Sequence, residues 1–223
     1  MRITWVILFS LFFSELYSQE SVEIRYWRSR LSYKEVNTMT VHSRQIPADV
    51  RLFFTDSMAY CYSFRMDGTN PCRNKKVIGD KLVHHGCFRN YATNEHFDEV
   101  VWPGADNYLI KDTIREYHWQ FFDTHKKILK RDCAAALHVN EKNDSLLVWY
   151  TTDMPYQKGQ LWYNNIPGVI LQVEDQERDI LIKAYRIKEH SKQIVTPREG
   201  IIVTRQQWAA IRDSLPRPKG LRH

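Results

Sequence analysis

Residues 169–187, VILQVEDQERDILIKAYRI, contain the pattern that decides the fold. Apolar residues occupy 169–173 except for Gln172 and recur through 180–187, and the polar run EDQER at 174–178 separates the two groups. Two short apolar runs joined by a few polar residues are typical of a β-hairpin. The stretch therefore predicts two antiparallel strands joined by a polar loop.

Similar strand-like segments recur along the rest of the chain, separated by polar turns such as Asp56-Ser57. These segments are 22–26, 50–55, 58–64, 82–91, 99–102, 108–111, 119–122, 133–139 and 145–151. Short strands at such regular spacing favour a large antiparallel sheet. We therefore predict a mainly β (α+β) protein built on a large curved antiparallel sheet.

One clear helical signal lies near the C-terminus. Thr204 and Gln207 have the spacing of a capping box, in which the Thr204 side chain accepts from the Gln207 backbone N–H and Gln207 reaches back. Three apolar residues then share one helical face: Trp208, Ile211 and Leu215. Pro216 ends this predicted helix, whereas residues 32–42 are compatible with a short helix or a loop.

The first 18 residues have the order of a secretory signal peptide. Arg2 supplies a positive charge, an apolar run follows over 3–13, and a more polar stretch ends at the small residue Ser18. At about 1.5 Å of rise per residue, this run is too short to cross a hydrocarbon core of ~30 Å. We therefore predict export and a mature product without a transmembrane segment. The first cysteine is Cys61, so cleavage near Ser18 leaves no N-terminal cysteine for a lipid.

The remaining sequence predicts one β-rich domain over 19–215 and a basic tail over 216–223. The formal net charge is +6, and Lys and Arg are spread along the chain. Nucleic-acid-binding proteins instead gather their basic residues on one face or one helix. We therefore predict no nucleic-acid partner.

Four cysteines follow the predicted signal peptide: Cys61, Cys72, Cys87 and Cys133. An even number of cysteines in an exported protein makes disulfides plausible, and four of them allow three connectivities. Cys61 and Cys72 flank a stretch rich in turn residues, which favours that pair and leaves Cys87–Cys133 as its complement. The alternative is four buried thiols.

No catalytic motif is present in the sequence, neither a Gly-x-Ser-x-Gly elbow nor a His-Glu-x-x-His pair nor a phosphate-binding glycine loop. The histidines considered as metal ligands are His84, His85, His96, His118, His125 and His138. His84 and His85 would point to opposite faces of a strand, and no two of the six have i, i+4 spacing on a predicted helix. The sequence therefore predicts no catalytic residue, no metal site and no cofactor.

Aromatic residues gather between 149 and 163, ahead of a Pro-Gly turn. The candidate ligand-binding residues are Trp149, Tyr150, Tyr156, Trp162, Tyr163, Pro167 and Gly168. Such rings either fill a corner of the core or line an apolar cleft that takes a lipid, a peptide or a partner loop.

Several motifs of the second half belong together, and they are WQF at 119–121, DTHKKILKRDC at 123–133, VWYTTDMP at 148–155, NIPGVILQVED at 165–175 and VTRQQW at 203–208. Together they resemble the GLPGLI family, exported proteins of Gram-negative bacteria that are named for a hexapeptide. The resemblance covers 108–213, and RLFFTDSMAY at 51–60 is a looser echo of the family's N-terminal hairpin. The resemblance implies a soluble protein of the periplasm, with an extracellular location as the alternative. It implies no particular biochemical activity, because none is assigned to the family. By analogy, the curved sheet would form a half-barrel like that of periplasmic lipoprotein carriers.

The sequence departs from the family pattern at two places. Asn165 stands where the name motif begins with Gly, and Ile166 and Val169 replace its two Leu residues. Arg131-Asp132 stands where a Gly-Tyr precedes Cys133. If that Gly serves a turn with positive φ, we expect strain at Arg131 or Asp132, or a different turn.

These observations lead to three functional hypotheses. The first is a non-enzymatic envelope protein that binds an apolar ligand or a partner protein through the ring-rich stretch. The second is an accessory subunit of an outer-membrane assembly, which requires an exposed apolar patch. The third is an envelope hydrolase, which requires that at least two residues of a set converge around one pocket, and the set is His118, His125, His138, Asp153 and Cys133.

Overall fold

The computed structural model describes residues 21–29, 31, 48–65, 84–101, 106–112, 116–191, 194, 196–197 and 199–215. The predicted signal peptide (1–18), the segment 32–42, Cys72 and the basic tail (216–223) lie outside the described residues.

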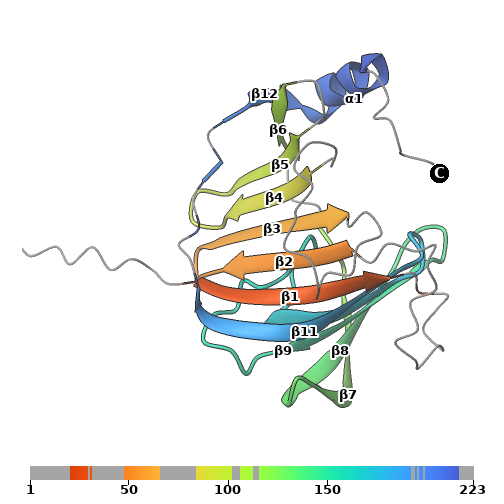
Figure 1. Ribbon diagram of the computed structural model, residues 1–223. Helices are drawn as coiled ribbons and strands as arrows, with labels where there is room; N and C mark the ends of the chain where they lie inside the picture. The colour runs from red at the N-terminus through yellow and green to blue at the C-terminus, as the bar shows by residue number, and fades with distance from the viewer. Residues whose placement is uncertain are drawn as a thin grey trace, which may run out of the picture.

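The described strands form a single twelve-stranded sheet (Figure 1). The strands of the first half are β1 (Ser21–Ser29), β2 (Ala48–Phe54), β3 (Met58–Arg65), β4 (His84–Asn90), β5 (Glu95–Val101) and β6 (Asn107–Lys111). Those of the second half are β7 (Gln120–Ile128), β8 (Arg131–Val139), β9 (Ser145–Thr151), β10 (Val169–Asp175), β11 (Ile180–Ser191) and β12 (Ile201–Thr204). The predicted mainly β class is confirmed.

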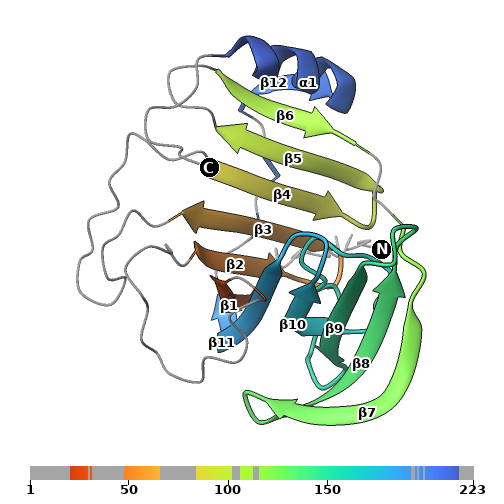
Figure 2. The ribbon, with the colours of Figure 1, turned by 90° about the vertical axis from the view of Figure 1, so that its right-hand side faces the viewer.

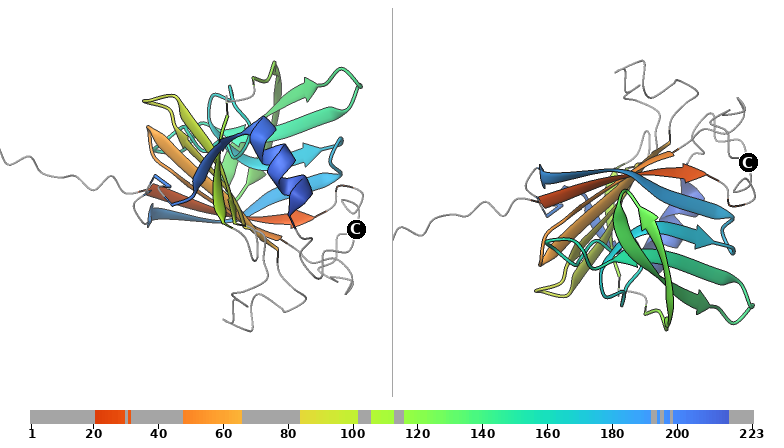
Figure 3. Two further views of the ribbon diagram at one scale, coloured as in Figure 1. Left: turned by 90° about the horizontal axis from the view of Figure 1, so that it is seen from above. Right: turned by 90° about the horizontal axis from the view of Figure 1, so that it is seen from below.

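The strand order in space is β12-β6-β5-β4-β3-β2-β1-β11-β10-β9-β8-β7. Every neighbouring pair is antiparallel except β12 with β6. The sheet is open, so β12 and β7 are its two edges. Seen from above and from below, the strands of the two ends cross at a steep angle, which shows a strongly twisted sheet (Figure 3).

The hairpin predicted from 169–187 is confirmed as β10 and β11, with Val173 opposite Ile182. β11 then pairs with β1, and this contact joins the two halves of the chain. All seven residues of β10 are buried, which explains why its sequence is a continuous apolar run at its start instead of an alternating one.

We call the face that carries Ile24, Leu52 and Val148 the inner face, because these side chains belong to the main core. Ile24 lies opposite Leu52, and Leu52 lies opposite Cys61, so alternate residues of β1, β2 and β3 enter this core together. On the outer face of the β4–β6 end, a smaller core forms around Phe88.

The C-terminal helix α1 (Arg205–Ser214) begins with the predicted capping box. The Gln207 backbone N–H donates to Thr204 Oγ1 over 3.2 Å, and the Thr204 N–H donates to Gln207 Oε1 over 2.8 Å. Trp208 is buried against Tyr108, so α1 covers the inner face near β6 and β12. Within the described residues, no helix has the length and apolar character needed to span a bilayer.

The structure extends some predicted strands and relocates one predicted turn. β7 continues to Ile128, and the tight turn into β8 places Leu129 at φ 51° and Lys130 at φ 67°. Two consecutive residues with positive φ are typical of a type I′ hairpin turn. Arg131 and Asp132 are instead the first residues of β8 and have no positive φ, so of the two expected outcomes the structure shows a different turn and not strain at these positions.

Candidate functional site

The predicted ring-rich residues occupy two environments. Tyr150, Tyr163 and Gly168 are buried, and Pro167 is exposed. Three further rings are partly buried and pack against the main core: Trp149, Tyr156 and Trp162. The structure therefore brings most of this set into the core region.

The connection 152–168 between β9 and β10 carries five of these residues and contributes side chains such as Leu161 and Ile166 to the main core. Arg89 of β4 fixes it, because its guanidinium donates to the backbone oxygens of Tyr163 over 3.0 Å and Trp162 over 2.7 Å. We call residues 152–168 the inner plug. Four of its side chains, from Met154, Leu161, Tyr163 and Ile166, are buried in the main core.

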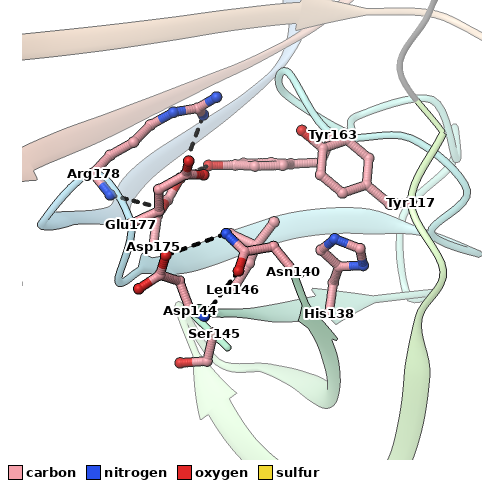
Figure 4. A pocket seen from close by; sticks show the side chains of 10 residues that line it. All are labelled: Tyr117, His138, Asn140, Asp144, Ser145, Leu146, Tyr163, Asp175, Glu177 and Arg178. Carbon is pink, nitrogen blue, oxygen red and sulfur yellow. Dashed lines mark hydrogen bonds and ion pairs between the residues drawn. The ribbon is translucent and has the colours of Figure 1, made fainter. Parts of the chain in front are cut away.

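The second half of the sheet carries a small polar pocket (Figure 4). Its lining comes from the turns at 140–145 and 175–178 and from Tyr117, His138 and Tyr163. The volume of the pocket that the centre of a water molecule can occupy is about 20 Å³, which is enough for one or two water molecules. Of the predicted ring-rich set, Tyr163 alone lines this pocket.

The polar groups of the pocket already bind one another. Asp175 accepts from the Tyr163 hydroxyl and from Arg178 Nη1, each over 3.3 Å. Asn140 donates to Asp144 Oδ2 over 3.3 Å. Burial, together with the charge of Asp175, raises the pKa of the Tyr163 hydroxyl well above its ordinary value. These contacts stabilise two neighbouring turns.

The residues required by the hydrolase hypothesis do not meet at this pocket. His138 lines it, and its Nδ1 is 3.0 Å from the backbone oxygen of His118. His125 is exposed on β7, and Cys133 is buried on β8. Asp153 is exposed and accepts from Arg131 through its backbone oxygen.

The predicted disulfides are wrong, because Cys61, Cys87 and Cys133 are free and buried. Cys87 on β4 and Cys133 on β8 are separated by many strands in the spatial order. Burial raises the pKa of the Cys61 thiol, and it raises the pKa of both Cys87 and Cys133 to about 11. The three thiols are therefore protonated at neutral pH.

One group of side chains among the described residues has the composition and proximity of a metal site: Cys87, His96 and Asp98. Sequence reasoning missed this group because it considered histidines by helical spacing. The available signal was a hairpin in which Cys87-x-Arg89 and His96-x-Asp98 flank a turn at 91–94. Pairing across that turn brings the alternate residues of both strands to one face.

The edge strand β7 and its partner β8 form a hairpin at the end of the sheet opposite α1 (Figure 2). We call residues 120–139 the edge hairpin. Phe121 is 50% exposed and Phe122 is 36% exposed, although both are large apolar residues. The described exposed large hydrophobics all lie on this hairpin or on the opposite edge strand β12.

Two residues of the predicted ring-rich set contact the edge hairpin. The Tyr150 ring meets the Phe121 ring edge to face, with 6.1 Å between centroids. The Lys126 ammonium lies 3.9 Å from the centroid of the Trp149 ring. Trp149 Nε1 is buried and has no hydrogen-bond partner among the residues that the structure describes.

The edge hairpin also carries charged contacts. His125 lies between two carboxylates, with Nδ1 2.6 Å from Asp132 Oδ2 and Nε2 3.4 Å from Asp123 Oδ1. Its hydrogen bond to Asp132 raises the pKa of the His125 imidazole. A register shift between Phe122 and His125 marks a bulge in β7.

Comparisons with known proteins match the fold. No protein-family model matches the sequence, and no curated protein is significantly similar to it. Two solved structures titled "Structure of PNGF-II", in the C2 and P21 space groups, superpose with TM-scores of 0.61 and 0.58 at 14% identity. They match 87% and 86% of this chain, which spans about a third (33%) of theirs. At this identity the likeness concerns the fold alone.

Proposed function

We propose that this protein is an exported, non-enzymatic component of the cell envelope that binds a partner protein through the edge hairpin. The observation that carries the proposal is the display of Phe121 and Phe122 on an edge strand that is exposed along most of its length. Exposed large apolar side chains that gather in one place mark interaction surfaces. Aromatic residues are also enriched among the residues that dominate binding energy.

The two rings lie on opposite faces of the edge hairpin, because they are consecutive residues of one strand. Phe121 adjoins Tyr150, whereas Phe122 lies opposite Ala135, which is itself opposite Trp149. A partner that contacts both faces of the edge hairpin would therefore bury Phe121 with Tyr150 on one face and Phe122 with Trp149 on the other.

Strand addition along the whole of β7 is disfavoured. The bulge after Phe122 interrupts the ladder, and Lys126 and Lys127 follow it. Bulges and lysines are the features by which natural edge strands avoid pairing with other chains. We therefore expect the partner to contact side chains of the edge hairpin instead of extending the sheet.

The charge of the edge hairpin indicates the partner's chemistry. Residues 120–139 contain four cationic side chains, from Lys126, Lys127, Lys130 and Arg131, against two aspartates, Asp123 and Asp132. Complementary potentials guide association between proteins. We expect a partner surface that is acidic around an apolar centre.

An internal apolar ligand receives less support, because the inner plug occupies the inner face and the pocket beside it is small and polar. The opposite edge receives less support as well. Ile201 and Ile202 are exposed there, but β12 has four residues, and short edge strands are themselves a protection against association.

The experiment compares two variants that each remove exposed apolar side chains. Phe121→Ser with Phe122→Ser alters the edge hairpin, and Ile201→Ser with Ile202→Ser is the matched control at the other edge. After mild cross-linking in cells, we expect the wild type and the control to recover the same envelope protein. The hairpin variant should lose at least about tenfold of it, as expected when aromatic contacts worth ~1.4 kcal/mol or more are removed. Equal recovery from both variants would contradict the proposal.

A further inference from the structure

A compact cluster of three potential metal ligands lies on the inner face of β4 and β5. Cys87 is directly opposite Asp98, and His96 lies two residues before Asp98 on the same face of β5. The thiol sulfur, one imidazole nitrogen and one carboxylate oxygen all lie within 4.8 Å of one another. Cys87 and His96 are buried, at 3% and 7% exposure.

The hydrogen bonding of His96 is incomplete. Its Nε2 is 3.3 Å from Asp98 Oδ1, while its Nδ1 is buried and has no hydrogen-bond partner among the described residues. A buried imidazole nitrogen is ordinarily paired, and an exception calls for a missing partner such as an ion. Rotation of the ring by a half turn exchanges Nδ1 with Cδ2 and Nε2 with Cε1, so the ring atoms that face the cluster depend on how the ring orientation is assigned.

We propose that Cys87, His96 and Asp98 bind a divalent transition-metal ion of the zinc class. Thiolate, imidazole and carboxylate are the three ligand types that zinc accepts in proteins, at about 2.0–2.3 Å and in tetrahedral geometry. The thiolate makes the set unsuitable for magnesium or calcium, which require oxygen ligands. The distances between the ligand atoms, which are at most 4.8 Å, need to shorten by only about an ångström to match those around a tetrahedral ion.

An outer contact to the Asp98 carboxylate favours the same assignment. Arg205, the first residue of α1, donates to Asp98 Oδ2 over 2.6 Å and also binds Asp112, so it orients the carboxylate and leaves Oδ1 directed at His96. Such outer contacts to ligating carboxylates are usual in metal sites. On the other side of β4, Cys61 of β3 lies opposite Cys87, outside the group of ligand atoms that lie within 4.8 Å of one another. On binding, Cys87 releases its thiol proton to solvent as the metal–sulfur bond forms.

This site is independent of the edge hairpin. β4 and β5 lie near one end of the strand order, and β7 and β8 form the other end. A bound ion would tie the second hairpin of the sheet to α1 through Asp98 and Arg205, so its expected effect is on the stability of that end.

The test uses Co²⁺ as a spectroscopic probe of the purified, reduced, full-length protein. We expect one equivalent of Co²⁺ to produce a sulfur-to-metal charge-transfer band and the visible bands of a tetrahedral ion, both removed by Zn²⁺. This part requires no variant, and a wild-type protein that gives no such band would overturn the proposal. Recovery of Cys61 and Cys87 as a disulfide from native envelopes would overturn it as well.

Variants then locate the ligands. Cys87→Ser should abolish the charge-transfer band, and His96→Gln or Asp98→Asn should weaken Co²⁺ binding by at least about tenfold. Cys133→Ser is the matched control, because Cys133 is another buried thiol, on β8 toward the other end of the strand order. This variant should bind Co²⁺ as the wild type does. A band that survives in Cys87→Ser and disappears in Cys133→Ser would contradict the assignment. Circular dichroism of each variant verifies that it is folded.

Discussion

Asn165 is a residue whose identity follows from its backbone conformation. Its φ is 63° and its side chain is exposed, so the left-handed conformation dominates its contribution to stability. Asn and Gly tolerate this conformation better than other residues do.

We expect Asn165→Ala to lower the free energy of unfolding by about 1 kcal/mol, because Ala is disfavoured at positive φ. Asn165→Gly should stay within about 0.5 kcal/mol of the wild type. Urea denaturation measures both changes. Glu141→Ala, at an exposed turn residue without positive φ, is the control and should have little effect. Equal losses for Ala and Gly would show that conformation is not the cause.

His125 gives the edge hairpin a dependence on pH. Because its hydrogen bond to Asp132 raises the pKa of the imidazole, the protonated form is the one that the fold stabilises. The stabilisation is complete below the unfolded pKa of about 6.5 and is lost as the pH rises through the higher folded value.

An NMR titration of the His125 ring should therefore give a pKa above about 6.5. Asp132→Asn should return that pKa toward the ordinary value, whereas Asp123→Asn should change it less, since Asp123 is the more distant carboxylate. A larger effect from Asp123 would mean that the pairing across the hairpin is incorrect.

At the scale of elements, a buried side chain of β4 binds the backbone of the inner plug. Arg89 is 3% exposed, and its two hydrogen bonds satisfy carbonyls of a segment more than seventy residues away in the sequence. Lys158 of the plug also lies over the Tyr91 ring, with 4.9 Å to the centroid. These contacts join the connection between β9 and β10 to the first half of the sheet.

Arg89→Met should lower the free energy of unfolding by about 3 kcal/mol or more, because two charge-assisted hydrogen bonds are lost and the carbonyls remain buried. Chemical denaturation measures this loss. Arg212→Met, which removes an exposed ion pair with Asp213, is the control and should cost less than about 1 kcal/mol. Similar values for the two variants would show that the plug is held by apolar packing alone.

The elements that sequence could predict are those set by local patterns. The hairpin of β10 and β11 and the capping box of α1 each depend on residues close together in the chain, and both are confirmed. The end of β7 was missed, because its residues 123–127 are polar and exposed on an edge, where no alternation is required. The sheet register that joins Cys87 to Asp98 was missed because the histidines were considered by helical spacing and not by pairing across the turn at 91–94.

The candidate sites required information that sequence does not carry. The ring-rich stretch was recognised from composition, but its burial involves residues far away in the sequence, such as Arg89 and the core residues of the first half of the sheet. The predicted disulfides failed for the same reason, since cysteine spacing does not reveal which strands are neighbours. Phe121 and Phe122 lay at the end of a predicted strand, but their exposure follows from the edge position of β7.

At the scale of the whole molecule, an open sheet has two edges that a closed barrel would lack. One edge is short and lies beside α1, as Figure 1 shows. The other is the nine-residue strand β7, which carries two exposed phenylalanines and a basic surplus. This asymmetry is the basis for assigning the partner to the edge hairpin.

Site-specific photo-cross-linking in living cells tests that assignment most directly. A photoreactive phenylalanine analogue is placed at position 122 on the edge hairpin or at position 202 on β12, the more exposed control. The account predicts one discrete cross-linked product with an envelope protein from position 122, and none of that product from position 202. The same product from position 202, or none from position 122 in folded and exported protein, would contradict it.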